Sequence, residues 1–328
     1  MIACSRFVST AIARRPLELE QLVQSGDLTR TYYPTKVTPD EAPPTSPAPA
    51  LVAHFESQLW HSPQIGGEGK YPGEHAVLEA LRVARHREWL RLAWRDIGGL
   101  TTTTQMMAEA SAFADAAVRF SLAHAHHDLA QRLGQPVDAQ QAPQQMIVLA
   151  LGKLGAGELN FSSDIDLIFA YPKAGETADG PRTLSNNEFF GRLARRLIAL
   201  LTRATAHGTV FRVDMRLRPF GDSGPLVMSF DAMEEYYRNH GRDWERYAMI
   251  RARPLTGDPV HSAELKARLQ PFVYRRYLDF GTLAMLRQMK RGMTEEVNRR
   301  GLHNDVKLGP GGIREVEFTA QAFQMVRG

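Results

Sequence analysis

The sequence predicts an α+β fold, in which a mixed β-sheet core is flanked by helical segments before and after it. Apolar residues recur at helical spacing from Glu74 to about Leu133. Short apolar runs typical of buried strands follow from Met146, and a helical pattern returns after Pro219. The order strand, turn, strand, helix, strand between these helical stretches indicates one mixed sheet packed against helices.

Residues 1–33 are expected to form N-terminal helices. One helix is predicted over Phe7–Ala13, stopped by Pro16, and a second over "LELEQLVQSGDL", closing on Gly26. Three arginines and no acid precede Glu18, which superficially resembles a transit peptide. We prefer a surface helix because a second helical pattern follows at once. Residues 34–50 include "TPDEAPPTSPAPA", a Pro/Ala-rich tract too poor in large apolar residues to pack, and are predicted to be a linker.

Residues 51–143 are predicted to be a helical region. In its first long helix the apolar positions lie on one side of the helical wheel and most arginines elsewhere; the apolar set is Leu78, Leu81, Trp89 and Leu92. A second helix is expected to begin after Thr104 as its N-cap and to stop at Gly134.

Residues 144–230 are predicted to be the α/β core. Its strands are expected at Met146–Leu151, Ile165–Tyr171 and Val210–Leu217. A capping-box pattern from Ser185 to Glu188 opens a helix. The apolar stripe of that helix is Phe189, Phe190, Leu193, Leu197, Leu200, Leu201 and Ala204. Residues 231–328 are predicted to be helical again, with a cap at Asp231.

Composition narrows the classes of function. The chain has 328 residues, with 40 basic and 36 acidic side chains and a net charge of +4. That balance suits contact with phosphates or an acidic protein, and it lacks the dense basic tails that bind nucleic acid. No apolar run approaches membrane-spanning length. The single cysteine, Cys4, excludes an internal disulfide and fits a reducing cytosol, so we expect a cytoplasmic protein. From the charge balance and the short apolar runs we expect neither nucleic-acid nor membrane partners.

Asp164 and Asp166 are the first candidates for chemistry. Side chains alternate along a strand, so both carboxylates project from one side and repel each other. A divalent cation such as Mg²⁺ resolves that conflict because it prefers oxygen ligands. The alternative is a solvent-facing pair at a strand end, and for a bare Asp-x-Asp this alternative is the better interpretation.

Two neighbouring features favour a site. Glycines stand between the first strand and the aspartates, so backbone N–H groups there can approach a phosphate; they are Gly152, Gly155 and Gly157. Asp214 is expected in the third strand with arginines on its own face, namely Arg212, Arg216 and Arg218. Three carboxylates and arginines beside a glycine turn are typical of two-metal phosphoryl or nucleotidyl transfer. The P-loop spacing is absent, so Lys153 is not a P-loop lysine.

The stretch "GKLGAGELNFSSDIDLIF" resembles the nucleotidyltransferase signature, and more narrowly the amino-terminal half of glutamine synthetase adenylyltransferase/deadenylylase. The resemblance continues in "RFVSTAIARRPLELEQLVQSGDL", "FRVDMRLRPFGDSGPLVMSFDAMEEYY", "GRDWERYAMIRARP", "PFVYRRYLDF" and "VKLGPGGIREVEFTAQAFQMVRG". It covers nearly the whole chain except the Pro-rich tract. It implies a nucleotidyltransferase-like core and a fragment of a bifunctional regulator of nitrogen assimilation, truncated at its C-terminal end.

In that family one half attaches AMP to a tyrosine of glutamine synthetase and the other removes it by phosphorolysis, giving ADP. The wording "ELNFSSDIDL" is similar to the removing half. The resemblance implies that Asp164, Asp166 and Asp214 hold two Mg²⁺ ions. It also implies that Gly155, Ala156 and Gly157 form the turn beneath the nucleotide phosphate.

Other roles stay open. Arg216 and Arg218 either grip phosphate oxygens or, for Arg218 beside Pro219, brace the turn; Ser162 and Ser163 either donate to phosphate or cap the turn. The implied partners are adenylylated glutamine synthetase, phosphate, ADP and ATP, and a PII-type signalling protein through the intact protein. The rival hypotheses are another protein nucleotidyltransferase, such as a uridylyltransferase, and a non-catalytic fragment that binds glutamine synthetase or a signalling protein.

Overall fold

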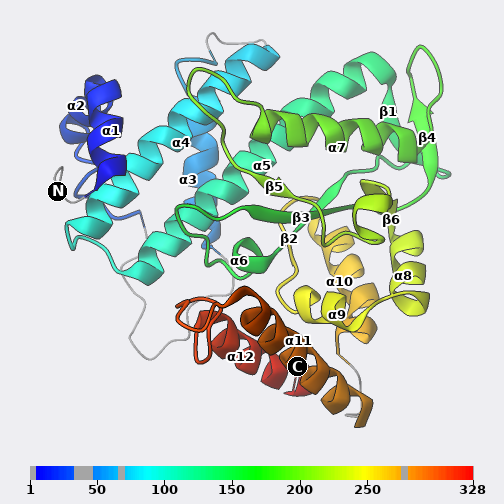
Figure 1. Ribbon diagram of the computed structural model, residues 1–328. Coiled ribbons are helices and arrows are strands. Elements are labelled where there is room, and N and C mark those ends of the chain that lie inside the picture. The colour runs from blue at the N-terminus through cyan, green and yellow to red at the C-terminus, as the bar shows by residue number, and fades with distance from the viewer. Residues whose placement is uncertain (1–4, 33–46, 66–70, 275–279, 328) are drawn as a thin grey trace.

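The computed structural model describes residues 5–32, 47–65, 71–274 and 280–327 and has the predicted α+β architecture. Its centre is a five-stranded mixed sheet with the strand order β5-β3-β2-β7, in which β6 also pairs with β3. Helices lie on both faces of this sheet, and the C-terminal helices form a separate layer beside it (Figure 1). The predicted linker lies largely outside the described residues.

The central strands are the two that the sequence predicts most clearly. β2 (Ile147–Leu151) is buried at every residue and runs antiparallel to β3 (Ile165–Tyr171). β3 pairs in parallel with both β5 (Val213–Asp214) and β6 (Val227–Ser229), while β7 (Arg253–Pro254) is antiparallel to β2. A continuous apolar run such as β2 forms because both faces of the sheet are covered.

The third predicted strand is much shorter than expected, covering two residues rather than Val210–Leu217. The Asp214 carboxylate accepts a hydrogen bond from the backbone N–H of Arg216 at 2.9 Å, and Arg218 N–H donates to Met215 O at 3.2 Å. A side chain that binds its own backbone two residues on favours a turn. The chain therefore leaves the sheet directly after Asp214.

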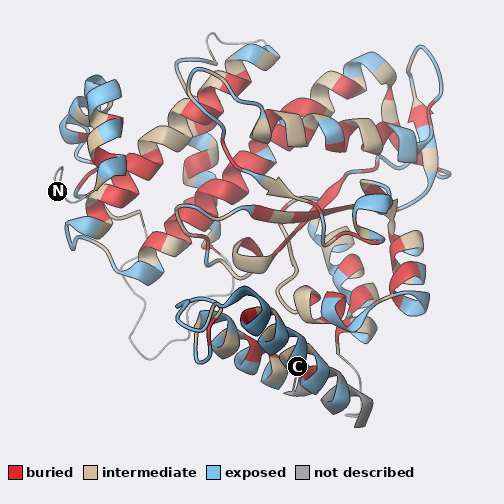
Figure 2. Cartoon of the chain, in the orientation of Figure 1, coloured by how far each residue is buried: buried red, intermediate tan, exposed pale blue. Residues whose placement is uncertain are grey.

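One face of the sheet packs against the first group of helices. These are α3 (Pro49–Trp60), α4 (Glu74–Ile97), α5 (Thr103–Leu133) and α7 (Asn186–Thr202). Figure 2 shows that α5 is buried along most of its length. Its many alanines allow close approach on all sides, as expected for a helix enclosed by the core. α3 begins at Pro49, within the range expected for the linker.

The helix ends confirm some predicted caps and correct others. Ser185 caps α7 by accepting from the N–H of Glu188, as predicted. The cap of α5 is Thr102 rather than Thr104, because Thr102 and Gln105 form a reciprocal capping box. Ser229, not Asp231, caps α8 (Phe230–Asn239). Ala204, expected in the apolar stripe of α7, lies beyond the end of that helix and is exposed.

The opposite face of the sheet packs against α8, α9 (Asp243–Met249) and α10 (Pro259–Val273). The paired helices α11 (Phe280–Arg300) and α12 (Ile313–Arg327) lie beyond them. Phe318 of α12 stacks on Tyr247 of α9, with 5.6 Å between the two ring centroids. At the other end, α1 (Arg6–Arg14) and α2 (Pro16–Gln24) are the two N-terminal helices that the sequence predicts, and they pack on α4. The described residues also include a small two-stranded antiparallel sheet, β1 (Gln135–Asp138) with β4 (Gly175–Ala178), and a short 3-10 helix at Gly221–Ser223. The sequence does not predict either of them.

Candidate active site

The acidic side chains of the site lie on neighbouring strands. Asp166 of β3 and Asp214 of β5 are register partners in a parallel pair, and Asp164 immediately precedes β3. Residues opposite each other in adjacent strands project to the same face. The sheet therefore brings together two carboxylates that are 48 residues apart in the chain, with the third at the entrance to the strand.

The electrostatics of Asp166 distinguish it from its neighbours. Burial raises its pKa to about 6, and the negative charges of Asp214 and Asp164 add to that rise. The Asp214 carboxylate, in contrast, has a pKa below its usual range because Arg216 donates hydrogen bonds to it. Asp166 is thus the member of the group that most needs a positive charge.

Two of the predicted arginines form ion pairs with these carboxylates. Arg216 Nε donates to both oxygens of Asp214, at 3.0 and 2.9 Å, and its own side chain is 75% exposed. Arg212 forms an ion pair with Asp164 and donates to Ser162 O at 2.9 Å. Both guanidinium groups lie at the surface, where a phosphate ligand can reach them.

The sequence predicts Arg218 on the same face as Asp214, but Arg218 does not lie at this surface. Its side chain is buried and donates from Nη1 to Met215 O at 2.8 Å, with Asp222 at 3.4 Å. These contacts hold the loop that follows β5. Of the two predicted roles, the structure places Arg218 where it braces the turn.

The glycine turn begins as a single helical turn, α6 (Gly152–Gly155), directly after β2. Gly152 has a φ of +54°, and a Cβ atom at this position would clash with Oδ2 of Asp166. The family resemblance implies that Gly155, Ala156 and Gly157 form the turn beneath the nucleotide phosphate. Gly152, which the sequence also places in this turn, is the glycine that lies against the Asp166 carboxylate.

The rest of the turn has other constraints. Gly155 is buried, and a Cβ atom on it would clash with the carbonyl oxygen of Arg251. Ala156 adopts a right-handed conformation with φ −81°, which its methyl group tolerates, whereas Gly157 has a φ of +72°. Ser163 N–H donates to Asn160 O at 3.2 Å, and its hydroxyl donates to Asn160 Oδ1 at 2.5 Å, so this serine caps the turn before β3. Ser162 is exposed.

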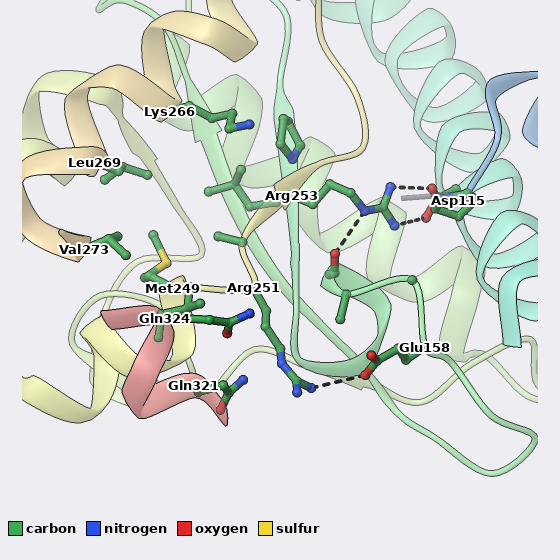
Figure 3. Close-up of a pocket in the computed structure, with 18 of the residues that line it drawn as sticks. Asp115, Glu158, Met249, Arg251, Arg253, Lys266, Leu269, Val273, Gln321 and Gln324 are labelled. Atoms are coloured by element: carbon green, nitrogen blue, oxygen red, sulfur yellow. Dashed lines mark hydrogen bonds and ion pairs between the residues drawn. The ribbon is translucent and has the colours of Figure 1, made fainter. Parts of the chain in front are cut away.

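A cavity of about 1170 Å³ borders the end of the turn. Gly155, Ala156 and Gly157 form part of its wall, together with residues of α5, α10 and α12 (Figure 3). The three aspartates do not line it. Gly152 at the start of the turn therefore lies against the Asp166 carboxylate, while Gly155, Ala156 and Gly157 at its end border the cavity.

Two residues behind the turn were missed by sequence reasoning. Asp115 of α5 and Arg253 of β7 form an ion pair at 2.6 Å and line the cavity wall (Figure 3). The available signal was Asp115 itself, an acidic residue that stands between alanines in α5.

Metal binding requires the carboxylates to be released from their arginines. Among the residues that the structure describes, no group of three His, Cys, Asp or Glu side chains is arranged to hold a metal ion. Asp164 and Asp214 each face an arginine instead. The donor chemistry nevertheless fits a hard divalent cation, because three carboxylates contribute to one site, and the pKa of Asp166 stays raised although the charge of Arg216 acts on it.

Comparison with known proteins gives the family. Residues 1–268 match the family model described as glutamate-ammonia ligase adenylyltransferase, and residues 287–328 match the one described as GlnD PII-uridylyltransferase. No helix in the described part of the chain is both long and apolar enough to cross a membrane.

Curated relatives named "bifunctional glutamine synthetase adenylyltransferase/adenylyl-removing enzyme" are similar over nearly the whole chain. The protein of Nitrosococcus oceani is 49% identical over 325 residues, which are 99% of this chain and 31% of the relative. Those of Thioalkalivibrio sulfidiphilus and Pseudomonas putida are 47% and 46% identical, again over 99% of this chain and 31% of each relative. The chain thus spans about a third of the length of these relatives. It belongs to the glutamate-ammonia ligase adenylyltransferase family.

Proposed function

We propose that this chain carries a nucleotidyltransferase site that removes AMP from glutamine synthetase by phosphorolysis and releases ADP. The observation that carries the proposal is the register pairing of Asp166 with Asp214, with Gly152 packed against the Asp166 carboxylate. This arrangement places backbone of a glycine turn next to paired carboxylates. The relatives' names include both adenylyl transfer and adenylyl removal, so they are consistent with this reaction, and the similarity of "ELNFSSDIDL" to the removing half favours its direction.

The proposed reaction exchanges one phosphate ester for one anhydride. An oxygen of inorganic phosphate attacks the phosphorus of the tyrosine-bound AMP, the bond from that phosphorus to the tyrosine oxygen breaks, and the tyrosine oxygen takes up a proton. The products are ADP and unmodified tyrosine. Little covalent chemistry is required of the protein, so positioning and charge stabilisation dominate.

The residues divide this work. Asp164, Asp166 and Asp214 would hold Mg²⁺, with a two-metal site as the arrangement that three carboxylates favour. The cation would neutralise charge on the phosphorus and on the departing tyrosine oxygen. Arg212 and Arg216 would exchange their carboxylate partners for phosphate oxygens, which accept charge-assisted hydrogen bonds from guanidinium groups as carboxylates do. Gly155, Ala156, Gly157, Ser162 and Ser163 would border the phosphate groups.

The test is incubation of the 328-residue chain with adenylylated glutamine synthetase, phosphate and Mg²⁺, following ADP. We expect Asp164→Asn to abolish metal-dependent ADP formation. Asp222→Asn is the matched control, because Asp222 is 80% exposed and lies in the loop after β5 without belonging to the carboxylate group. Wild-type rates of ADP formation by Asp164→Asn would refute the assignment.

A second candidate is uridylyl transfer, favoured by the match of residues 287–328 to the PII-uridylyltransferase family model. The same match supports a PII-type signalling protein as a partner of the intact protein. Incubation with UTP and a PII protein separates the two: uridylylated PII without any ADP from adenylylated glutamine synthetase favours the second candidate. Binding of glutamine synthetase with neither product identifies a non-catalytic module.

A further inference from the structure

We infer that Arg253 is a positioning residue that holds the glycine turn in place for the proposed site. It acts from behind the turn, through backbone carbonyls, and it contacts none of the three aspartates. The inference rests on the proposed function of the turn and extends it to a residue of β7 that lies about 40 positions beyond Asp214.

Arg253 uses its guanidinium group as a clamp on the end of α6. Nη2 donates to Leu154 O at 2.8 Å, and Nε donates to Gly155 O at 3.2 Å. The same group donates to both oxygens of Asp115, from Nη1 at 2.6 Å and from Nη2 at 3.1 Å. One planar fork with five N–H donors thus joins the turn to α5 (Figure 3).

The anchor of this clamp is rigid. Asp115 is 1% exposed and lies within the most enclosed helix of the chain. A buried carboxylate of this kind is stable as an ion only with a hydrogen-bonded cation beside it, and burial raises its pKa despite Arg253. The pair therefore fixes Arg253 with respect to α5, and Arg253 fixes the carbonyls of the turn.

The backbone just before β7 adds a second contact from the same side. The carbonyl oxygen of Arg251 lies so close to Gly155 that a Cβ atom there would clash with it. Gly155 is the last residue of a single helical turn whose first residue, Gly152, contacts Asp166. A shift at one end of so short an element moves the other end, so the clamp sets how Gly152 meets the carboxylate.

Lysine cannot reproduce this arrangement. An ammonium group is a compact point charge that can pair with Asp115, but it cannot reach both oxygens of Asp115 and two separate carbonyls in one plane. Arg253→Lys therefore keeps the buried charge balanced while releasing the turn. This separates positioning from simple electrostatic stability.

Arg82 is a matched control for this substitution. It is likewise buried and donates to several carbonyls, among them Leu78 O at 2.9 Å and Leu200 O at 3.1 Å. Its contacts tie α4 to the end of α7 and touch neither the aspartates nor the turn. Arg82→Lys should cost folding stability without changing the kinetics of the folded enzyme.

The experiment compares wild type, Arg253→Lys and Arg82→Lys in the full chain. Three quantities are measured: kcat and KM for phosphate in ADP formation, binding of ADP with Mg²⁺ by calorimetry, and amide hydrogen exchange of residues 152–158. For Arg253→Lys we expect faster exchange in this segment and a fall in kcat of about ten- to a hundredfold, the effect of a displaced site. Arg82→Lys should leave all three unchanged at a temperature where it is folded.

The outcomes are decisive either way. Unchanged exchange at residues 152–158 together with wild-type kcat in Arg253→Lys overturns the inference. If Arg253→Lys does not fold, Asp115→Asn replaces it: the freed Arg253 loses its anchor, and the same faster exchange is expected. If wild type shows neither ADP formation nor ADP binding, the proposed function fails, while the exchange measurement still decides whether Arg253 holds the turn.

Discussion

At Asp166, burial and the neighbouring negative charges both act against ionisation of the carboxyl. Its carboxyl is partly buried between two other acidic side chains, and its pKa is raised to about 6 from an ordinary 3.8. A raised carboxyl pKa means that the folded state holds the proton more tightly than the unfolded state. Folding stability from this group is therefore complete below about pH 4 and is lost as the pH rises to about 6.

The raised pKa of Asp166 predicts how Asp166→Asn changes the folding stability. The neutral amide removes the repulsion, so the metal-free variant should be more stable than wild type at pH 7.5 by about 1 kcal/mol, a value discounted for the exposed part of the carboxyl. Near pH 4 the two should be equally stable. Thermal unfolding followed by circular dichroism in a chelator checks this, and a variant less stable than wild type at pH 7.5 would show that the carboxyl is not strained.

Gly152→Ala is the corresponding test of the turn. The added methyl group must displace the Asp166 carboxylate or the turn, and φ is +54°, so we expect loss of Mg²⁺ binding and of ADP formation. Gly191→Ala is the control, since Gly191 lies within α7 and its Cβ would only reach ordinary contact with Arg195. That change should be neutral or stabilise by up to about 1 kcal/mol. Magnesium titration by calorimetry distinguishes them; equal binding by both variants would contradict the geometry.

The N-terminal cap of α5 can be tested by substitution, because the observed cap differs from the one expected from the sequence. Thr102 and Gln105 form a reciprocal capping box, whereas Thr104 is an exposed residue of the first turn. Thr102→Ala should lower the free energy of unfolding by about 1 kcal/mol, and Thr104→Ala by much less. Urea denaturation measures both, and a larger loss for Thr104→Ala would favour the cap expected from sequence over the observed one.

Elements differ in how well the sequence predicts them. β2, β3 and α7 were predicted nearly to the residue, because an uninterrupted apolar run and an apolar stripe reflect burial that the whole fold imposes. β5 was predicted too long: the Asp214 side chain binds the Arg216 backbone, and alternation along the sequence does not reveal such a turn. Short strands such as β1 and β7 have no pattern of their own and form only because a partner strand is present.

The sequence predicts the acidic residues of the candidate site better than the contacts that hold them in place. Asp166 lies on a recognisable strand with Asp164 directly before it, and the parallel pairing of β3 with β5 places Asp214 opposite Asp166. The contact of Gly152 with Asp166, and the clamp of Arg253 on Leu154 and Gly155, depend on how distant segments approach each other. Local pattern carries no information on such contacts, so the sequence does not predict them.

At the scale of the whole molecule, buried arginines join the helical layers. Arg91 is fully enclosed and donates to Glu88 Oε2 at 2.8 Å, pairs with Glu109 of α5, and lies 4.0 Å from the ring centre of Tyr32. The network connects α4, α5 and the segment after α2. The sequence pattern predicts the arginines of α4 away from its apolar positions, but several of them are buried between helices.

Arg91→Leu should therefore be severely destabilising. It leaves two buried carboxylates without their cation, which typically costs about 3–5 kcal/mol. Arg132→Leu is the control, because the Arg132 pair with Asp128 is exposed and contributes less than about 1 kcal/mol. Chemical denaturation of both variants gives the comparison, and a loss for Arg91→Leu no larger than that for Arg132→Leu would remove this network from the account of the core.

The fate of labelled phosphate shows whether the paired carboxylates catalyse phosphorolysis. The chain is incubated with adenylylated glutamine synthetase, Mg²⁺ and ³²P-labelled inorganic phosphate, and the nucleotide products are separated. Phosphorolysis predicts label in the β-phosphate of ADP for wild type and Asp222→Asn, and none for Asp214→Asn. Release of unlabelled AMP, or label in ADP that persists in Asp214→Asn, would contradict phosphorolysis at the paired carboxylates.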